Sequence, residues 1–172
     1  MAYRTKTYIA GDWTGDKDLI DTLYYWNDSQ RLTLSFFDAH EMTQARDTSL
    51  PCSIKKSLAV RLDASKTFVL IVGDATDSLT KGSCRYCGSY NAYTGSCARG
   101  MYVDYRSFIK YECQKAANDG LKIVVLYNAT SVNRNKCPEV LRYKGQQVAA
   151  IYRGIDGKLY WDYQSIKNAI MG

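Results

Sequence analysis

Two short, unbroken apolar segments constrain this chain more than any other feature. Residues 67–72 read TFVLIV and residues 122–127 read KIVVLY, without the alternation of apolar and polar side chains that marks a half-exposed strand. Strands that are apolar on both faces are typical of parallel sheets covered by helices on each side. The two segments therefore predict an α/β protein with a parallel sheet at its centre.

Segments with helical periodicity alternate with the strand-like segments along the whole chain. Strands are expected at residues 5–11, 32–37, 67–72, 122–127 and 148–152, and residues 154–161 are expected to form a turn or short ribbon. Helices are expected after the N-caps Asp16, Ser49 and Asp162 and at residues 105–118. This alternation with right-handed crossovers predicts a flavodoxin-like three-layer sandwich with a five-stranded parallel sheet, as a single domain over residues 1–172.

Several classes of protein are excluded by what the sequence lacks. No apolar run approaches the roughly 20 residues that span a bilayer, and residues 1–13 lack the apolar region of a secretory signal. The glycine-rich loops that bind phosphates in common nucleotide-binding folds are also missing. We therefore expect a cytoplasmic protein without a membrane partner.

Charge and tyrosine content describe the surface. The formal charge of +6 is spread along the chain, with no basic run longer than Lys55-Lys56. We therefore expect a solvated surface and no DNA binding. The fifteen tyrosines are interpreted mainly as half-buried packing residues with polar tips.

Six cysteines include Cys84-x-x-Cys87 followed by Cys97, within a segment rich in Gly, Ser and Tyr at residues 82–100. Disulfides are not expected in a reducing compartment, so the alternatives are metal ligands and free or redox-active thiols. A structural zinc site needs four ligands, and this segment supplies three. The sequence favours free thiols and leaves a zinc site at these three cysteines open.

Polar residues collect where the predicted strands end. In a parallel α/β sheet, ligands bind beyond the carboxyl ends of the strands. Short polar residues at these positions also form turns and helix caps, so each position has two explanations. The single histidine, His40, is interpreted as a loop residue. The candidates for a binding site at this edge are Asp12, Trp13, Asp38, Asp74 and Thr76.

Glu112 lies within an expected helix, three residues after Ile109. Ile109 and Cys113 belong to the apolar stripe of that helix, so Glu112 falls at the border of the stripe. A carboxylate at this position is either exposed and paired with Lys110 or Lys115, or half-buried because of a long-range contact. Spacing alone favours the exposed position.

Three stretches, in this order, resemble a known family. Residues 7–10 with residues 16–26 are similar to its first strand and helix, and residues 53–72 are similar to an SI…L…S…VLIV signature. Residues 108–112 (FIKYE) fall on a W-C-x-x-E pattern. Together they resemble the TIR-like domains of bacteria, most closely the flavodoxin-like branch that includes Thoeris-type antiphage proteins. The chain departs from this pattern at Phe108 and Ile109, where the family often has Trp and Cys.

The resemblance implies a TIR-like fold and an enzyme that cleaves NAD, with Glu112 as the catalytic glutamate. Nicotinamide is a cationic leaving group, and a single carboxylate can stabilise the oxocarbenium-like ribose that its departure leaves. The product would be ADP-ribose, a cyclic isomer or a transferred form, acting as an antiphage signal. NAD is then a substrate, and no bound cofactor is expected. In such a site Phe108 would pack beside nicotinamide, Trp13 would stack on a ring, and hydrogen bonds to the substrate would come from Asp12, Asp38, Asp74 and Thr76.

The resemblance also implies protein partners. Residues 40–50 match the position of the family's assembly loop, so we expect a homo-oligomer or a downstream effector protein. The alternative is a non-catalytic TIR-like scaffold for protein–protein assembly, in which Glu112 is a surface residue. A phosphoacceptor receiver shares the fold but needs a lysine after the last strand, where this chain has Tyr152-Arg153.

Overall fold

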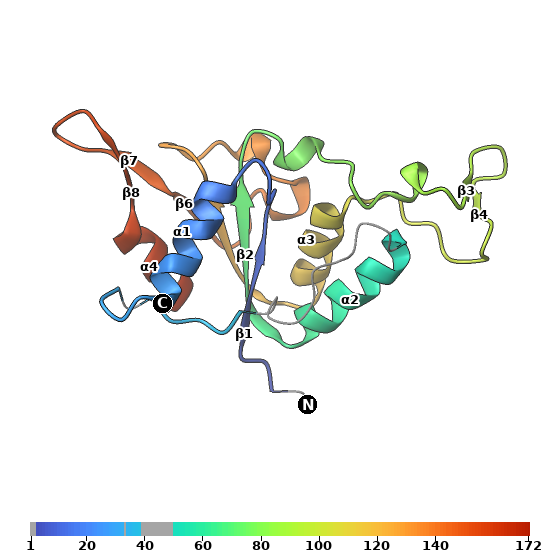
Figure 1. Ribbon diagram of the computed structural model, residues 1–172, viewed down its shortest axis with the longest axis horizontal. Helices are drawn as coiled ribbons and strands as arrows, with labels where there is room; N and C mark the ends of the chain where they lie inside the picture. Colours follow the sequence, from blue (N-terminus) through green and yellow to red (C-terminus); the bar gives the residue numbers. More distant parts are fainter. Residues whose placement is uncertain (1–2, 33, 39–49) are drawn as a thin grey trace.

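The computed structural model describes residues 3–32, 34–38 and 50–172, and its core is a parallel sheet of four strands (Figure 1). The register places Phe68 between Tyr8 and Ile123. The predicted α/β class is therefore confirmed, and the two apolar segments are its central strands. The spatial order is β1 (Lys6–Ala10), β2 (Ser65–Val72), β5 (Lys122–Tyr127) and β6 (Gln146–Ala149).

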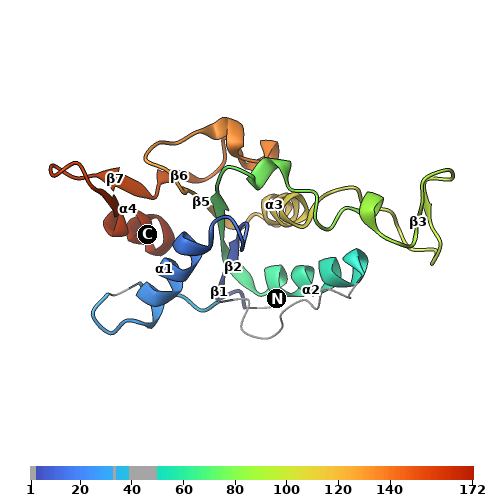
Figure 2. The ribbon, with the colours of Figure 1, turned by 45° about the horizontal axis from the view of Figure 1, so that its top comes forward.

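Helices cover both faces of this sheet (Figure 2). One face carries α1 (Lys17–Asp28) and α4 (Tyr163–Met171), and the other carries α2 (Pro51–Asp63) and α3 (Phe108–Asn118). Phe68 and Leu70 of β2 join the core beneath α2 and α3, whereas Val69 and Ile71 join the core beneath α1 and α4. This burial on both sides is why β2 lacks polar alternation. None of the helices in the described ranges has the length and apolarity required to cross a membrane.

The helices follow the predicted apolar spacing closely. Asp162 caps α4 as predicted. α3 begins at Phe108, later than predicted, because the Ser107 hydroxyl accepts a hydrogen bond from the Lys110 backbone N–H at 3.2 Å and so forms the cap. The predicted cap of α2, Ser49, lies outside the described residues. All four predicted positions of α1 are buried: Leu19, Ile20, Leu23 and Trp26.

The strand predicted at residues 32–37 does not form a ladder in its described part. The contact of this region with β1 is a single parallel bridge between Thr7 and Asp38. In this bridge the Thr7 N–H donates to the Phe37 carbonyl at 2.7 Å. The backbone N–H of the preceding residue, Phe36, donates to the Asn27 side chain in α1, also at 2.7 Å. The predicted five-stranded sheet is therefore corrected to four strands and one bridging segment.

The strand predicted at residues 148–152 is divided in two. β6 stays in the sheet, whereas β7 (Ile151–Arg153) pairs with β8 (Leu159–Trp161) in an antiparallel hairpin. Ala150 lies between them: its N–H donates to the Tyr127 carbonyl and its carbonyl accepts from the Asp162 N–H, each at 2.8 Å. These two contacts turn the chain out of the sheet, and the predicted ribbon is the outer part of the hairpin.

A second projection leaves the layers between β2 and α3. After the short helix η1 (Thr76–Ser78), residues 79–106, which we call the arm, run outward and return. Figures 1 and 2 place the arm and the β7–β8 hairpin at opposite ends of the molecule. The arm contains η2 (Cys84–Tyr86), β3 (Tyr90–Asn91) and β4 (Ser96–Cys97), while η3 (Arg134–Lys136) and η4 (Glu139–Leu141) lie between β5 and β6.

Candidate functional site

The carboxyl ends of β1, β2 and β5 meet at one edge of the sheet, where a pocket of about 220 Å³ lies. This edge is where open parallel sheets bind ligands. Two of the predicted binding residues, Asp12 and Asp74, lie together here. The pocket is lined by Asp12, Gly15, Asp16, Gly73, Asp74, Ala75 and Asn128.

Asp16 is a buried carboxylate of this pocket. Its Oδ1 accepts a hydrogen bond from Asn128 Nδ2 at 2.9 Å, and its carboxylate packs on Gly73, where a Cβ atom would overlap it. Although Asp16 precedes α1, its side chain caps no backbone N–H of that helix. Burial raises the pKa of Asp16, with smaller contributions from Asp12 and Asp74, while the Asn128 hydrogen bond lowers it. The Asp16 side chain therefore contributes to the lining of the pocket and does not act as the cap of α1.

The polar groups of the pocket favour one class of ligand. Carboxylates accept hydrogen bonds and repel anions, so they suit hydroxyl and amine groups and oppose phosphate. Asp74 is exposed and pairs with Lys136, and the hydrogen bond from that lysine lowers the pKa of Asp74. The carboxylates of the pocket can therefore orient a ligand by accepting hydrogen bonds from its hydroxyl or amine groups.

Two other predicted binding residues, Trp13 and Asp38, contact Tyr24 of α1 and do not line the pocket. The Tyr24 hydroxyl donates to Asp38 Oδ2 at 2.8 Å. The Trp13 ring stacks on Tyr24 with ring centroids 6.1 Å apart. Asp38 is buried by these contacts, whereas Trp13 is 48% exposed and keeps contact with solvent.

Thr76 and Phe108 also lie apart from the pocket lining, and each packs within the fold. The buried hydroxyl of Thr76 accepts from the Gly73 N–H at 2.8 Å and so closes the turn after β2. The Phe108 ring packs against Gly82, whose φ of +96° and missing Cβ permit the close approach. Their predicted contacts with substrate remain predictions.

Glu112 lies on the inner face of α3, with 6% of its surface exposed. It accepts a hydrogen bond from the hydroxyl of Tyr8 in β1, which is itself fully buried. Burial raises the pKa of Glu112 to about 7, while the Tyr8 hydrogen bond and the charge of Arg61 act in the opposite direction. A carboxyl group with this pKa exchanges its proton near neutral pH, as many catalytic carboxyl groups do.

The register of α3 explains why Glu112 is buried. Glu112 belongs to the buried stripe and not to its border, so the exposed position that spacing favoured is wrong. The lysines expected to pair with it have other partners: Lys110 pairs with Asp77, and Lys115 with Asp63 and Asp119. Glu112 does not line the pocket at the strand ends. The buried residues of α3 are Ile109, Glu112, Cys113 and Ala116.

The cysteines of the predicted zinc site lie in the arm. Cys84 and Cys87 flank a turn, Cys97 lies in β4, and all three are free and half-buried. Across residues 3–32, 34–38 and 50–172, no three His, Cys, Asp or Glu side chains come together in a way that could hold a metal ion. His40, together with the predicted assembly loop up to residue 49, lies outside the described residues.

Three residues of these sites were not among the predicted site residues. Tyr8 is one of several large side chains in an apolar strand, and nothing local marks it as a partner of Glu112. Asp16 was interpreted as a helix cap, which is the usual role of an aspartate before an amphipathic helix. Asn128 carried a usable signal, because it follows β5 directly at the edge where the other strands end.

No protein-family model matches the chain, and a search of curated proteins finds no match to its sequence.

Proposed function

We propose that this chain is a TIR-like enzyme that cleaves the bond between nicotinamide and ribose in NAD, with Glu112 as the catalytic residue. The observation that carries this proposal is the buried Glu112 carboxyl group, bonded to Tyr8, with a pKa of about 7. Burying a carboxyl group costs free energy that an apolar residue at this position would not cost. Groups perturbed in this way are concentrated at functional sites.

The finer fold in this proposal is flavodoxin-like and TIR-like. The bridge between Thr7 and Asp38 lies on the edge of β1 that faces away from β2. Counting residues 34–38 at that edge gives the order 2-1-3-4-5, the order of flavodoxin-like sheets. Glu112 then lies on the helix after the third segment, the position of the family's W-C-x-x-E pattern.

In its ionised form Glu112 would stabilise the positive charge that develops on the ribose as nicotinamide leaves. Nicotinamide departs as a neutral molecule, so this step needs no general acid. Tyr8 acts as a positioning residue because it holds one carboxylate oxygen. Since Glu112 is almost fully buried, NAD must displace neighbouring side chains to reach it, and we expect slow turnover by the isolated chain.

The pocket at the strand ends would contact a different part of NAD, because Glu112 does not line it. Asp12 and Asp74 would accept hydrogen bonds from ribose hydroxyls or the adenine amine. NAD is the substrate in this proposal and no bound cofactor is needed. The product, ADP-ribose or a cyclic or transferred form, would act as a cytoplasmic antiphage signal on a downstream effector, with the enzyme working as a homo-oligomer.

The test is nicotinamide release from NAD by the full chain at pH 8, followed by liquid chromatography and mass spectrometry. Glu112→Gln keeps the size of the side chain and an acceptor for Tyr8 but cannot ionise. Glu139→Gln is the matched control, because Glu139 is an exposed glutamate. We expect release by wild type and by the control, and none by Glu112→Gln. The mass of the co-product then distinguishes a hydrolase from a cyclase.

Two results would contradict the proposal. Turnover retained by Glu112→Gln would show that Glu112 is not the catalytic residue. The second result is that neither wild type nor either variant releases nicotinamide, even at high protein concentration and after addition of extract from phage-infected cells. The chain would then not be an NAD-cleaving enzyme.

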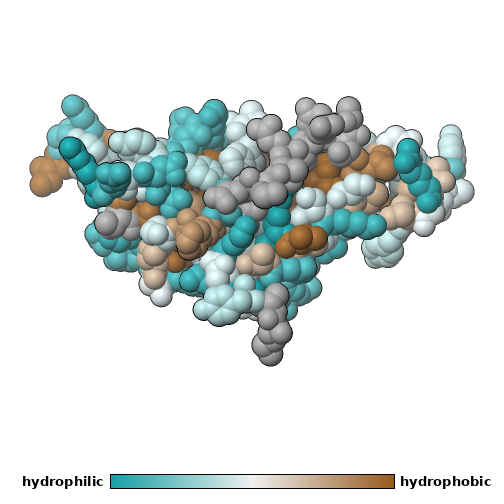
Figure 3. Space-filling model, turned by 60° about the horizontal axis from the view of Figure 1, so that its bottom comes forward, coloured by the Kyte–Doolittle hydropathy of each residue, from teal (hydrophilic) through white to brown (hydrophobic). Residues whose placement is uncertain are grey.

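A second candidate function, a non-catalytic TIR-like scaffold for protein–protein assembly, is favoured by a different observation. The arm exposes Tyr86, Tyr93 and Tyr102, and the β7–β8 hairpin exposes Ile155. Figure 3 shows an apolar tip at the hairpin end of the molecule. Tyrosine is enriched at protein interfaces. If this is the function, Tyr93→Ser lowers self-association in sedimentation experiments, and wild type leaves NAD intact.

A further inference from the structure

Cys84 and Cys87 form the two ends of a tight turn at the base of the arm. The Cys87 N–H donates to the Cys84 carbonyl at 3.0 Å, across η2. A turn closed in this way places its first and fourth Cα atoms within about 7 Å, and disulfides join Cα atoms about 4.4–6.8 Å apart. Both thiols are free and half-buried, whereas Cys113 and Cys137 are fully buried. The pair is therefore placed to form a disulfide and to meet a small reactant.

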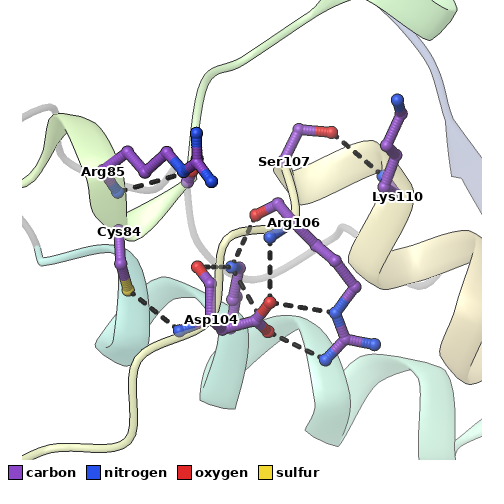
Figure 4. Close-up of polar contacts among 8 residues, drawn as sticks. Cys84, Arg85, Asp104, Arg106, Ser107 and Lys110 are labelled. Atoms are coloured by element: carbon purple, nitrogen blue, oxygen red, sulfur yellow. Dashed lines mark hydrogen bonds and ion pairs between the residues drawn. The ribbon is translucent and has the colours of Figure 1, made fainter. Parts of the chain in front are cut away.

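The sulfur of Cys84 lies beside a backbone donor and a lysine side chain. The backbone N–H of Asp104 donates to Cys84 Sγ at 3.4 Å (Figure 4). The Lys55 ammonium lies in the same cluster, donating to the Arg106 carbonyl at 2.7 Å, and its charge interacts with Cys84. The thiolate is the nucleophile in disulfide exchange, and Cys84 is the cysteine of the pair whose sulfur has these two neighbours.

Asp104 is the carboxylate that the described part of the chain places in this cluster, and it is paired with cations. Asp104 accepts two hydrogen bonds from the Arg106 guanidinium, at 2.9 and 2.8 Å, and pairs with Lys55 at 3.4 Å. Its negative charge is therefore largely balanced by these two cations. Cys97 lies in β4, where it is paired with Tyr90 of β3.

We propose that Cys84 and Cys87 form a thiol–disulfide exchange site, with Cys84 as the attacking thiol and Cys87 as the resolving thiol. The reactant is a low-molecular-weight disulfide such as oxidised glutathione. The Cys84 thiolate attacks one of its sulfurs, the small disulfide bond breaks, and the first small thiolate leaves and takes up a proton. Cys87 then loses its proton and attacks Cys84 Sγ in the mixed disulfide, which releases the second small thiol. Two protein thiols are oxidised and the small disulfide is reduced to two thiols.

The test uses the full, reduced chain in a glutathione redox buffer, followed by alkylation of the remaining thiols and digestion with trypsin. Trypsin cleaves after Lys81, Arg85 and Arg99, so Cys84 leaves in the peptide 82–85, and Cys87 and Cys97 leave in the peptide 86–99. A disulfide between Cys84 and Cys87 therefore links the two peptides. The variants are Cys84→Ser, Cys87→Ser and the control Cys97→Ser, each checked for folding by circular dichroism.

We expect the linked peptides in wild type and in Cys97→Ser, and not in Cys84→Ser or Cys87→Ser. Cys87→Ser should instead accumulate glutathione on Cys84, because its resolving thiol is missing. Four results would overturn the proposal: loss of the link in Cys97→Ser, a disulfide within the peptide 86–99, stoichiometric zinc in the purified chain, or no disulfide in an oxidising buffer.

Discussion

The Tyr8 hydroxyl donates a hydrogen bond to the Glu112 carboxyl group and so joins β1 to α3 across 104 positions of sequence. Tyrosine is neutral, so this partner does not supply the positive charge by which a lysine or arginine keeps a carboxylate ionised. Burial raises the pKa of Glu112 more than the Tyr8 hydrogen bond and the charge of Arg61 lower it, so its carboxyl group stays protonated to a higher pH than that of a surface glutamate. Stability and the proposed catalysis depend on the same proton.

The first prediction concerns stability against pH. In the unfolded chain Glu112 loses its proton near its ordinary pKa of 4.5, whereas the folded chain keeps it until about 7. The stabilising effect of the proton is therefore complete below pH 4.5 and is lost as the pH rises through 7. We expect wild type to lose about 3 kcal/mol relative to Glu112→Gln between pH 4 and pH 8, from urea unfolding at each pH.

The matched control for this prediction is Glu139→Gln, which removes an exposed glutamate. It should follow the wild-type curve at every pH. If wild type and Glu112→Gln stay parallel from pH 4 to pH 8, the pKa of Glu112 is not raised by folding.

The second prediction concerns Tyr8. Because the Tyr8 hydrogen bond lowers the pKa of Glu112, Tyr8→Phe should raise that pKa above 7. The chain contains three glutamates, so labelling glutamate with ¹³C gives three carboxyl signals, and the highest midpoint in an NMR titration should belong to Glu112. In the variant this midpoint should move to higher pH, and the pH at which NAD cleavage reaches half its maximum should move with it. An unchanged midpoint would show that Tyr8 does not hold the carboxylate.

The third prediction concerns the contact between Gly73 and Asp16. A methyl group at position 73 would overlap the Asp16 carboxylate, which must then leave its place beside Asn128. Overpacking of this kind costs about 1–3 kcal/mol, so Gly73→Ala should lower the unfolding midpoint in urea. Gly88→Ala is the control, since nothing lies within 4 Å of a Cβ there, and it should change stability by less than about 1 kcal/mol. Equal stability of the two variants would mean that Asp16 is not packed on Gly73.

The fourth prediction concerns the base of the arm. The buried ammonium of Lys55 donates to the Arg106 carbonyl and pairs with Asp104, so Lys55→Met leaves both acceptors without this donor. We expect a loss of about 2–3 kcal/mol, together with faster cleavage of the arm by chymotrypsin, because its exposed tyrosines become easier to bind. Lys56→Met, one position along α2 and exposed, should change neither measurement. Cleavage at the wild-type rate would show that Lys55 does not anchor the arm.

The layers of this fold could be predicted because their signals are local. Burial can be predicted from the residues of a single strand at 67–72, and from those of a single helix between Leu19 and Trp26. The position of the pocket followed from a topological rule, and Asp12 and Asp74 lie where that rule placed them.

The remaining features depend on long-range contacts. Glu112 is buried because of Tyr8 and the register of α3, and helical spacing alone left its position at the border of a stripe. The division between β6 and β7 depends on the contacts of Ala150 with β5 and Asp162. Residues 34–38 meet β1 in one bridge, between Thr7 and Asp38, and the Phe36 N–H is held by Asn27 of α1. No short sequence pattern predicts any of these contacts, because each joins residues that only the folded chain brings together.

The hydrogen bonds at the base of the arm affect which changes of sequence and length the arm can accept. The Phe108 N–H donates to the Lys81 carbonyl at 2.8 Å, and the Cys84 N–H donates to the Asp104 carbonyl at 3.0 Å. These two hydrogen bonds join the outgoing and returning chains at the base of the arm. Doubling the length of a flexible loop costs only about 0.6 kcal/mol. Residues 85–103 can therefore be lengthened, shortened or replaced during evolution at a small cost in free energy. Such changes can give the arm new binding partners while the sheet stays the same.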